Sequence, residues 1–195
     1  MLRKLFITLA ILLGFVASTL AQDKARDAVR LSAIYNRTDF PLVRTGGYRV
    51  TENVSGYTVE GDVKIFGPGG LRASLAYNFK QAYNVEVFPD YFNGMKMVDL
   101  YRNVQTHSGG AQLDYTVKGA IELFGALFYG TRKIHENAPR QIVQTFRFGV
   151  NIPFHKKSPF FIKGYLDFDK PYGQLPMGFV NPDTRTLGVG AGFRF

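Results

Sequence analysis

Apolar and polar side chains alternate with a period of two residues along most of the chain, from Val29 to its end. In the run that follows the turn signal at 67–70, Leu71 and Leu75 fall on one face and Arg72 on the other. Alternation of this kind is the signature of β-strands, because successive side chains of a strand point to opposite sides. Eight such runs, each bounded by turn-forming residues, predict an all-β protein of eight strands.

The eight runs share this alternation and similar lengths. They cover 29–36, 57–65, 71–80, 111–118, 121–132, 142–154, 160–169 and 187–195. The fifth run is the least regular, because Phe124 and Phe128 fall on its polar face.

The connections between the runs alternate in length. Those around 67–70, 119 and 155–158 are short, and those around 38–55, 81–108, 133–141 and 171–183 are longer. Short turns on one side and long loops on the other are typical of outer-membrane barrels. With the N-terminus in the periplasm, all the long loops face the cell exterior.

Residues 1–21 have the pattern of a signal peptide. Arg3 and Lys4 form a charged start, 5–17 is an uncharged apolar run, and small residues at its end supply a cleavage site. A membrane anchor is the alternative, but an anchor needs about 20 apolar residues and this run is shorter. We therefore predict an exported chain whose processed part, 22–195, is a single barrel domain.

The processed part of the sequence lacks any apolar run long enough for a membrane-spanning helix. If it lies in a membrane, it must span it as a closed barrel, because hydrocarbon cannot satisfy the backbone groups of an open sheet. Alternation alone leaves the inside face undecided, since a soluble lipocalin-like barrel alternates with its apolar face inward.

Aromatic residues on the apolar face favour the membrane interpretation. They gather at two levels: Tyr35, Tyr57, Tyr77, Phe79, Tyr129 and Phe168 near the outer rim, and Phe154, Phe160, Phe193 and Phe195 near the inner rim. Such girdles place ring side chains at the height of the lipid headgroups. We therefore predict an eight-stranded antiparallel up-and-down barrel in the outer membrane of a Gram-negative cell, surrounded by outer-membrane lipid and lipopolysaccharide.

The polar face carries charges of both signs at mid-strand. We predict that they form a luminal charge network of Arg30, Glu60, Asp62, Lys64, Arg72, Asp114, Lys118, Glu122, Arg147, Lys163 and Asp167. These charges could line a pore or could pair and fill the lumen; a solvated face of a soluble sheet would carry similar charges. An eight-stranded barrel is only wide enough for side chains to occupy its interior, and an unpaired buried charge is costly. The filled lumen is therefore the favoured interpretation.

Composition excludes several kinds of chemistry. The chain has 195 residues and a formal charge of +9, but its basic residues are scattered at strand spacing, so we predict no nucleic-acid binding. The absence of cysteine excludes disulfides, thiolate metal sites and a lipidated N-terminal cysteine. The three histidines, His107, His135 and His155, fall on different sides of the predicted topology, and we expect neither a metal site nor a cofactor.

Two short motifs resemble functional sites. Gly188, Gly190 and Gly192 imitate part of a nucleotide-binding fingerprint, which requires a following helix; small residues facing a crowded interior explain them better. His107 and Ser108 are the nearest candidates for a catalytic pair. Adjacent residues of a strand point to opposite faces, so we predict no catalytic residues.

The leader, the eight amphipathic strands and the ending GVGAGFRF at 188–195 together resemble the small outer-membrane barrels of the OmpA transmembrane-domain and OmpX type. The resemblance covers the whole processed chain. It implies that the terminal Phe195 is an assembly signal read by the barrel-assembly machinery. Because nothing follows Phe195, the peptidoglycan-binding domain of full-length OmpA is not expected.

The second long connection, 81–108, carries an unusual number of large apolar residues. Tyr83, Phe88, Tyr91, Phe92 and Tyr101 make it a possible contact loop for a surface partner. Packing against other loops, or extension of the flanking strands as a hairpin, would also explain them. We expect a structural or surface-interaction role; a narrow porin-like channel for small solutes or ions is the alternative, and a lipid-modifying enzyme is the third.

Overall fold

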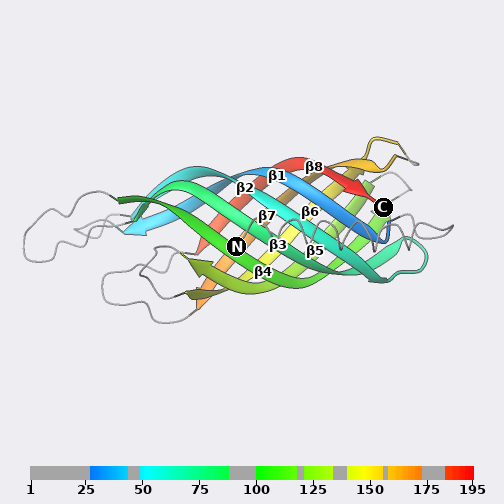
Figure 1. The fold of residues 1–195 in the computed structure, drawn as a ribbon, viewed down its shortest axis with the longest axis horizontal. Helices are drawn as coiled ribbons and strands as arrows, with labels where there is room; N and C mark the ends of the chain where they lie inside the picture. The colour runs from blue at the N-terminus through cyan, green and yellow to red at the C-terminus, as the bar shows by residue number, and fades with distance from the viewer. Residues whose placement is uncertain are drawn as a thin grey trace, which may run out of the picture.

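The computed structural model describes residues 27–43, 49–87, 100–117, 121–133, 140–155, 158–172 and 183–195. These residues form eight antiparallel strands that close into a barrel in sequence order (Figure 1). The strands are β1 Val29–Val43, β2 Arg49–Phe66, β3 Leu71–Val87, β4 Leu100–Val117, β5 Ile121–Lys133, β6 Gln141–Pro153, β7 Phe160–Tyr172 and β8 Thr184–Arg194. The predicted signal peptide, 1–21, lies outside the described residues.

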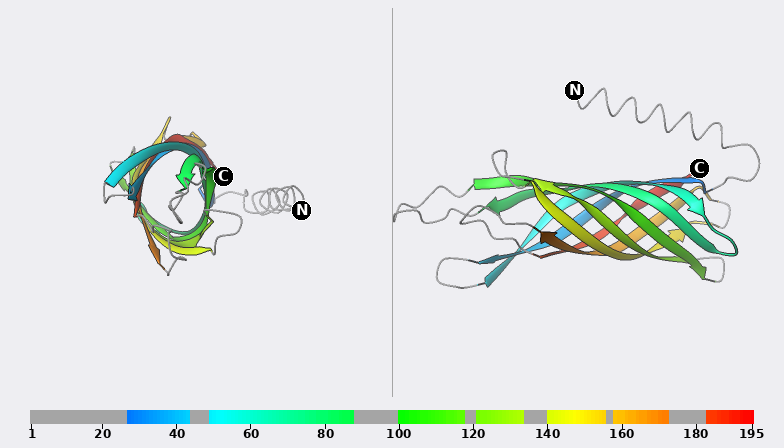
Figure 2. Two further views of the ribbon diagram at one scale, coloured as in Figure 1. Left: turned by 90° about the vertical axis from the view of Figure 1, so that its left-hand side faces the viewer. Right: turned by 90° about the horizontal axis from the view of Figure 1, so that it is seen from below.

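Pairing of the first strand with the last closes the barrel. The pairs between β1 and β8 run from Arg30 opposite Arg194 to Asp39 opposite Arg185. A view down the barrel shows the strands as a continuous ring (Figure 2). The predicted eight-stranded antiparallel meander is therefore confirmed. No helix among the described residues is long and apolar enough to cross a membrane.

The two ends of the barrel differ in their connections. Phe195 lies at the end where β2 meets β3, and its carbonyl accepts hydrogen bonds from the backbone N–H groups of Asp27 (2.6 Å) and Ala28 (2.9 Å). Gly69 and Gly70 turn the chain there with φ angles of 59° and 93°, which glycine adopts readily. We call this the turn end; the three longest connections, 88–99, 134–140 and 173–183, lie at the opposite, loop end.

Apolar side chains cover the outside of the barrel wall, and polar ones point into it. Outward residues such as Tyr35, Leu75 and Phe148 are 57–59% exposed, although they are large and apolar. The residues that alternate with them are buried, and most are polar or charged. An apolar belt around a polar interior is the arrangement of a barrel that faces lipid.

Aromatic rings contact one another at both ends of this apolar belt. Near the loop end, Tyr57 contacts Phe79 with 5.8 Å between ring centroids. At the turn end, Phe193 lies 4.9 Å from Phe160 and 4.6 Å from Phe195, both edge to face. These rings lie where the apolar belt ends, at the height expected for lipid headgroups.

Four strands project beyond the rest of the wall at the loop end. In the described residues, β4 pairs with β3 as far as Leu100 but with β5 only as far as Gln105. Likewise, β1 pairs with β2 as far as Val43 but with β8 only as far as Asp39. The outer parts of β1–β4 therefore continue the wall as two paired ribbons, β1 with β2 and β3 with β4, because β2 pairs with β3 only as far as Gly56 opposite Ala82. We call these four outer strand parts together the projecting sheet.

The projecting sheet corrects two predicted loops. The connection expected around 38–55 is strand at 38–43 and 49–55, and the one expected around 81–108 is strand at 81–87 and 100–108. The sequence hid these strand ends because the polarity of the two faces inverts there. On the outer face of β1, Tyr35 is followed towards the loop end by the charged Arg37. On the inner face, the polar Asn36 is followed further on by the apolar Phe40.

Candidate functional site

The lumen holds a network of paired charges. Among the described residues, its ion pairs join seven cations with seven carboxylates. The cations are Arg30, Arg72, Lys80, Arg132, Arg147, Lys163 and Arg194, and the carboxylates are Asp27, Glu60, Asp62, Asp114, Glu122, Asp167 and Asp169. The network is thus formally neutral, which reduces the cost of burying so many charges.

Arg30 and Arg72 organise the half of the network at the turn end. Arg30 binds Asp27 at 2.5 Å, Glu122 at 2.9 Å and Asp114 at 3.2 Å. Arg72 binds Asp62, and lies 3.5 Å from a second oxygen of Asp114. Because these residues come from β1, β2, β3, β4 and β5 as well as the segment before β1, the ion pairs tie opposite sides of the wall together.

Arg147 is the centre of the network. Its Nε and Nη2 donate to the two carboxylate oxygens of Asp167 on the neighbouring strand, at 2.5 and 2.8 Å. Its Nη1 donates to Glu60 across the lumen, and Glu60 also accepts from Lys163. A bidentate arginine–carboxylate pair is among the stronger hydrogen-bonded ion pairs, so Arg147 fixes β2, β6 and β7 relative to one another.

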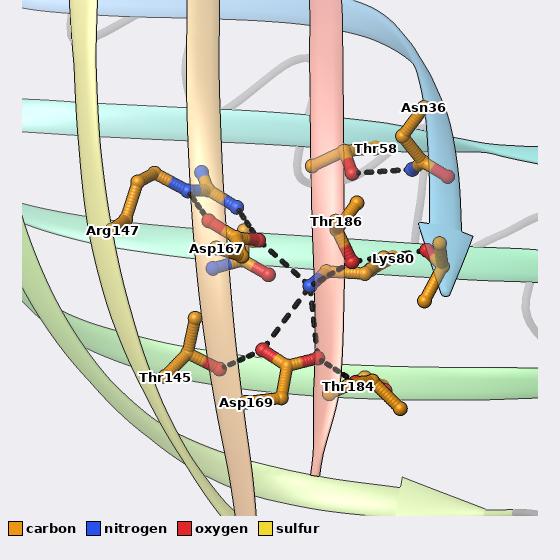
Figure 3. Close-up of polar contacts among 12 residues, drawn as sticks. Asn36, Thr58, Lys80, Thr145, Arg147, Asp167, Asp169, Thr184 and Thr186 are labelled. Carbon is orange, nitrogen blue, oxygen red and sulfur yellow. Dashed lines mark hydrogen bonds and ion pairs between the residues drawn. The ribbon is translucent and has the colours of Figure 1, made fainter. Parts of the chain in front are cut away.

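Asp169 gathers the groups nearer the loop end (Figure 3). It accepts from Arg132 at 2.6 Å, from Thr145 at 2.7 Å and from Thr184 at 3.0 Å. Lys80 lies between the two aspartates of β7, 2.7 Å from Asp167 and 3.1 Å from Asp169. Donors thus surround the carboxylates of Asp167 and Asp169, which offsets the cost of burying their negative charges.

Aromatic rings fill the space between the ion pairs. The Arg147 guanidinium lies 3.9 Å from the ring centroid of Tyr165 and 5.1 Å from that of Phe128. The Lys163 ammonium lies 4.4 Å from the ring centroid of Phe124. These contacts explain the irregular fifth run of the sequence, because its inward phenylalanines meet cations face-on.

Glycines on the facing strands make room for these rings. A Cβ at Gly149 would collide with the ring of Phe124, one at Gly188 with the ring of Tyr165, and one at Gly192 with a third inward ring. The glycine series near the C-terminus therefore faces a crowded interior, and the rings lie flat against backbone.

An apolar cluster lies above the network at the loop end. Phe40, Val54, Ala82 and Val104, one from each projecting strand, point inward and are almost completely buried. The Phe40 ring lies 5.9 Å from the Arg132 guanidinium, so the cluster covers the outermost cation. From the turn end to this cluster, most of the inward side chains that the structure describes are buried.

Comparison with known proteins adds the fold class. No protein-family model and no curated protein sequence matches the chain. Among solved structures, the neisserial surface protein A (NspA) superposes with a TM-score of 0.59 at 10% identity, covering 88% of this chain and 100% of NspA. Ail, the attachment invasion locus protein of Yersinia pestis, gives a TM-score of 0.50 at 14% identity, covering 89% of this chain and 100% of Ail.

The chain has the fold of the small eight-stranded outer-membrane β-barrels. The shared fold and the exposed apolar belt together support an outer-membrane location. In this outer-membrane barrel, the apolar belt faces lipid and the charge network fills the interior.

The structure places most of the predicted network residues inside the barrel. Nine of the residues named from the sequence are buried in the lumen: Arg30, Glu60, Asp62, Arg72, Asp114, Glu122, Arg147, Lys163 and Asp167. Lys64 is exposed, and it lies beside the register shift in the pairing of β2 with β3 near the turn end. Lys118 lies outside the described residues.

Sequence reasoning missed five members of the network. Asp27 and Arg194 lie at the turn end, where the predicted strands begin and end. Lys80, Arg132 and Asp169 alternate in step with the inward residues of their strands. They lie near the predicted strand ends, however, and the prediction covered only charges at mid-strand. The signal that identifies them is this alternation itself, since β3 and β7 continue beyond the predicted boundaries.

His107 and Ser108 point to opposite faces of β4. His107 is outside, where its Nδ1 lies 2.7 Å from the Tyr77 hydroxyl and its ring stacks near Phe79. Ser108 is inside and donates to Asn78. The two side chains therefore cannot act on one substrate atom.

The residues of the possible contact loop fall into three groups. Tyr83 lies in β3, is exposed, and its ring lies 5.8 Å from that of Tyr57. Tyr101 lies in β4 opposite Glu86. Phe88, Tyr91 and Phe92 lie outside the described residues. The part of this segment that the structure describes is thus a hairpin of extended strands.

Proposed function

We propose that this outer-membrane barrel is a surface-interaction protein, in which the plugged barrel anchors the projecting sheet and its connections outside the cell. The observation that carries this proposal is the inversion of polarity along β1–β4. On the turn-end side of this inversion the apolar face of the strands points outward, and on the loop-end side it points inward. A polar outer face is solvated by water and not by lipid, so the outer ends of these strands are suited to lie beyond the membrane.

Hydrogen bonds on the outer surface of the projecting sheet support its exposure to water. Arg37 donates to Asn53 at 2.7 Å, and Asn53 donates to Asp39 at 2.7 Å, across the pairing of β1 with β2. The inward cluster around Phe40 takes one residue from each of the four strands and so packs the two ribbons against each other at their base. Strands with a polar outside and an apolar inside can hold their shape beyond the membrane.

The sheet also has features of a contact surface. The unpaired edges at the outer ends of β1 and β4, and those of β2 and β3 beyond Gly56 and Ala82, carry backbone groups that an added strand could pair with. Tyr83 exposes an aromatic ring on its outer face, and large apolar residues continue into the segment that joins β3 to β4. Aromatic side chains are enriched where proteins bind one another.

The packed lumen argues against the channel alternative. Arg147, Asp167 and Lys163 are shielded from solvent, and each charge has a partner of opposite sign. A solute that passed through would have to displace several buried ion pairs at once, and each unpaired charge left behind is costly.

Trimming the projecting sheet tests the proposal. In the trimmed barrel, an Asn-Gly turn replaces residues 41–51 and a second Asn-Gly turn replaces residues 83–103. The residues that flank each turn, Phe40 with Glu52 and Ala82 with Val104, are register partners, so a two-residue turn can join them. The matched control shortens 133–140 between Arg132 and Gln141, which are also register partners. Heat-modifiable migration on a gel verifies that each barrel folds.

Adhesion is compared among cells that display the full barrel, the trimmed barrel or the control, with barrel-free cells as the baseline. Attachment to epithelial monolayers and to matrix-protein-coated surfaces, and aggregation of the cells with one another, are measured. We expect the full and control barrels to raise at least one of these, and the trimmed barrel to return it to baseline. Equal values for the full and trimmed barrels would show that the projecting sheet is not the contact surface.

A further inference from the structure

A row of exposed cations follows one side of the barrel at the loop end. The structure gives five consecutive strands, from β5 through β8 to β1, one outward cation each: Lys133, Arg140 directly before β6, Lys170, Arg185 and Arg37. We call these five residues the cationic band. All five are exposed, in contrast to the buried cations of the lumen.

The cationic band lies directly above the apolar belt. On β7, outward Phe168 is followed two residues later by Lys170, and on β1, Tyr35 is followed by Arg37. On β8, which runs the other way, Leu187 occupies the same place relative to Arg185. Two residues of strand span about 7 Å, so the cations reach the zone where lipid headgroups lie.

Among the described residues, the outward side chains on the opposite side of the barrel are uncharged at this height. They are Asn53 and Ser55 on β2, Gln81 and Tyr83 on β3, and Asn103 and Gln105 on β4. A general need for solubility would spread charge around the whole rim. The one-sided distribution indicates a specific anionic neighbour along β5–β1.

The positive charge of the band exceeds the local negative charge. Asp39 and Asp183 are the acidic side chains that the structure describes on the same outer rim. The network that the structure describes takes seven residues of each sign, so it uses none of the chain's surplus of 24 basic over 15 acidic residues. The charge of the band is therefore available to a ligand.

We infer that the cationic band binds the phosphates of a phosphorylated glycolipid in the outer leaflet, with the acyl chains against the adjoining apolar belt. Guanidinium groups pair with phosphate oxygens in bidentate geometry, and Lys170 adds a point charge. A membrane lipid fits better than free phosphate because the band and the belt are continuous on β7, β8 and β1. A headgroup with two phosphates fits better than a single phosphate, because five strands about 4.8 Å apart give a band far wider than one phosphate.

The test uses the refolded full barrel in zwitterionic detergent micelles. Its binding to bisphosphorylated lipid A is compared with binding to the same lipid after removal of both phosphates, and with phosphatidylglycerol as a single-phosphate lipid. The variants are Lys170→Gln, Arg185→Gln, Arg37→Gln and the triple combination. The matched control is Lys64→Gln, which removes an exposed cation at the turn end.

We expect the bisphosphorylated lipid to bind more tightly than the other two and to lose affinity as salt is added. Each single substitution in the band weakens binding about fivefold, and the triple substitution about a hundredfold, on the scale set by one cation near an anionic surface. Lys64→Gln leaves binding unchanged, and every variant keeps its heat-modifiable migration. Equal binding with and without the phosphates, or an unaffected triple variant, would overturn the inference. Equal binding of phosphatidylglycerol would overturn the assignment to a glycolipid.

Discussion

Arg147 donates to both carboxylate oxygens of Asp167, at 2.5 and 2.8 Å, directly across the pairing of β6 with β7. Neither side chain is accessible to solvent. The same guanidinium donates to Glu60 and lies 3.9 Å from the ring centroid of Tyr165. One arginine thus holds two carboxylates and one ring in the middle of the barrel.

Removal of this arginine should strongly destabilise the barrel. Arg147→Gln leaves Glu60 and Asp167 buried with a reduced set of cations, and breaking such a buried pair costs about 3–5 kcal/mol. Urea unfolding of the refolded protein in micelles, followed by circular dichroism, measures the loss. Lys64→Gln, an exposed substitution, should leave the unfolding midpoint unchanged; similar midpoints for the two variants would remove Arg147 from the centre of the network.

Two glycines on neighbouring strands should respond oppositely to alanine. At Gly188 a Cβ would collide with the Tyr165 ring, whereas at Gly164 the nearest atom would be 4.0 Å away. Gly188→Ala should therefore destabilise the barrel by about 1–3 kcal/mol through overpacking. Gly164→Ala should be neutral or stabilise it by up to about 1 kcal/mol, because alanine restricts the unfolded chain. The same unfolding assay compares them, and a Gly188→Ala variant as stable as Gly164→Ala would show that the ring does not lie against the glycine.

The alternation of side chains was sufficient to predict eight strands, the meander and the closed barrel. It was not sufficient for the strand ends, because β1–β4 invert their polarity where Phe40 and Val54 turn inward. A pattern method interprets an inverted stretch as a loop, since neither face continues the earlier preference.

The sequence also could not show which groups pair across the lumen. Glu60 and Arg147 are 87 positions apart and on strands that are not neighbours, so alternation gives each an inward direction but no partner. Phe124 looked irregular because its cavity is made by Gly149 on the next strand, which only the register of β5 with β6 brings opposite.

The packed lumen predicts that the folded barrel does not conduct. Reconstituted in planar bilayers, the unmodified protein should show no steady unitary current. Replacing the inward rings, Phe124→Ala with Phe128→Ala, should introduce a leak, whereas the outward pair Phe146→Ala with Phe148→Ala should not. Steady unitary currents from the unmodified protein, altered when Arg72 or Glu122 is replaced, would establish the narrow-channel alternative instead.

Phe195 should matter more for assembly in cells than for the stability of the finished barrel. Its carbonyl closes the turn end through its backbone, which Phe195→Ala keeps, while the ring contact with Phe193 is lost. If the ring is an assembly signal, Phe195→Ala should lower the amount of folded barrel in outer membranes several-fold and leave refolding yield in detergent nearly unchanged. A parallel fall in both yields would assign the ring a packing role, and an unchanged cellular yield would exclude the signal. Phe193→Ala serves as the control for ring loss at the same level.

Apolar side chains face lipid while charged ones fill the tube, and this arrangement can be measured directly. The chain contains no tryptophan, so a single introduced tryptophan reports on its own surroundings. Phe148→Trp lies on the outward face, and Phe128→Trp and Phe161→Trp lie on the inward face. In bilayers of brominated phospholipid, tryptophan at 148 should be strongly quenched and tryptophan at 128 and 161 weakly quenched, each in a barrel verified by heat-modifiable migration. Stronger quenching at the inward positions, or equal quenching at all three, would contradict this arrangement.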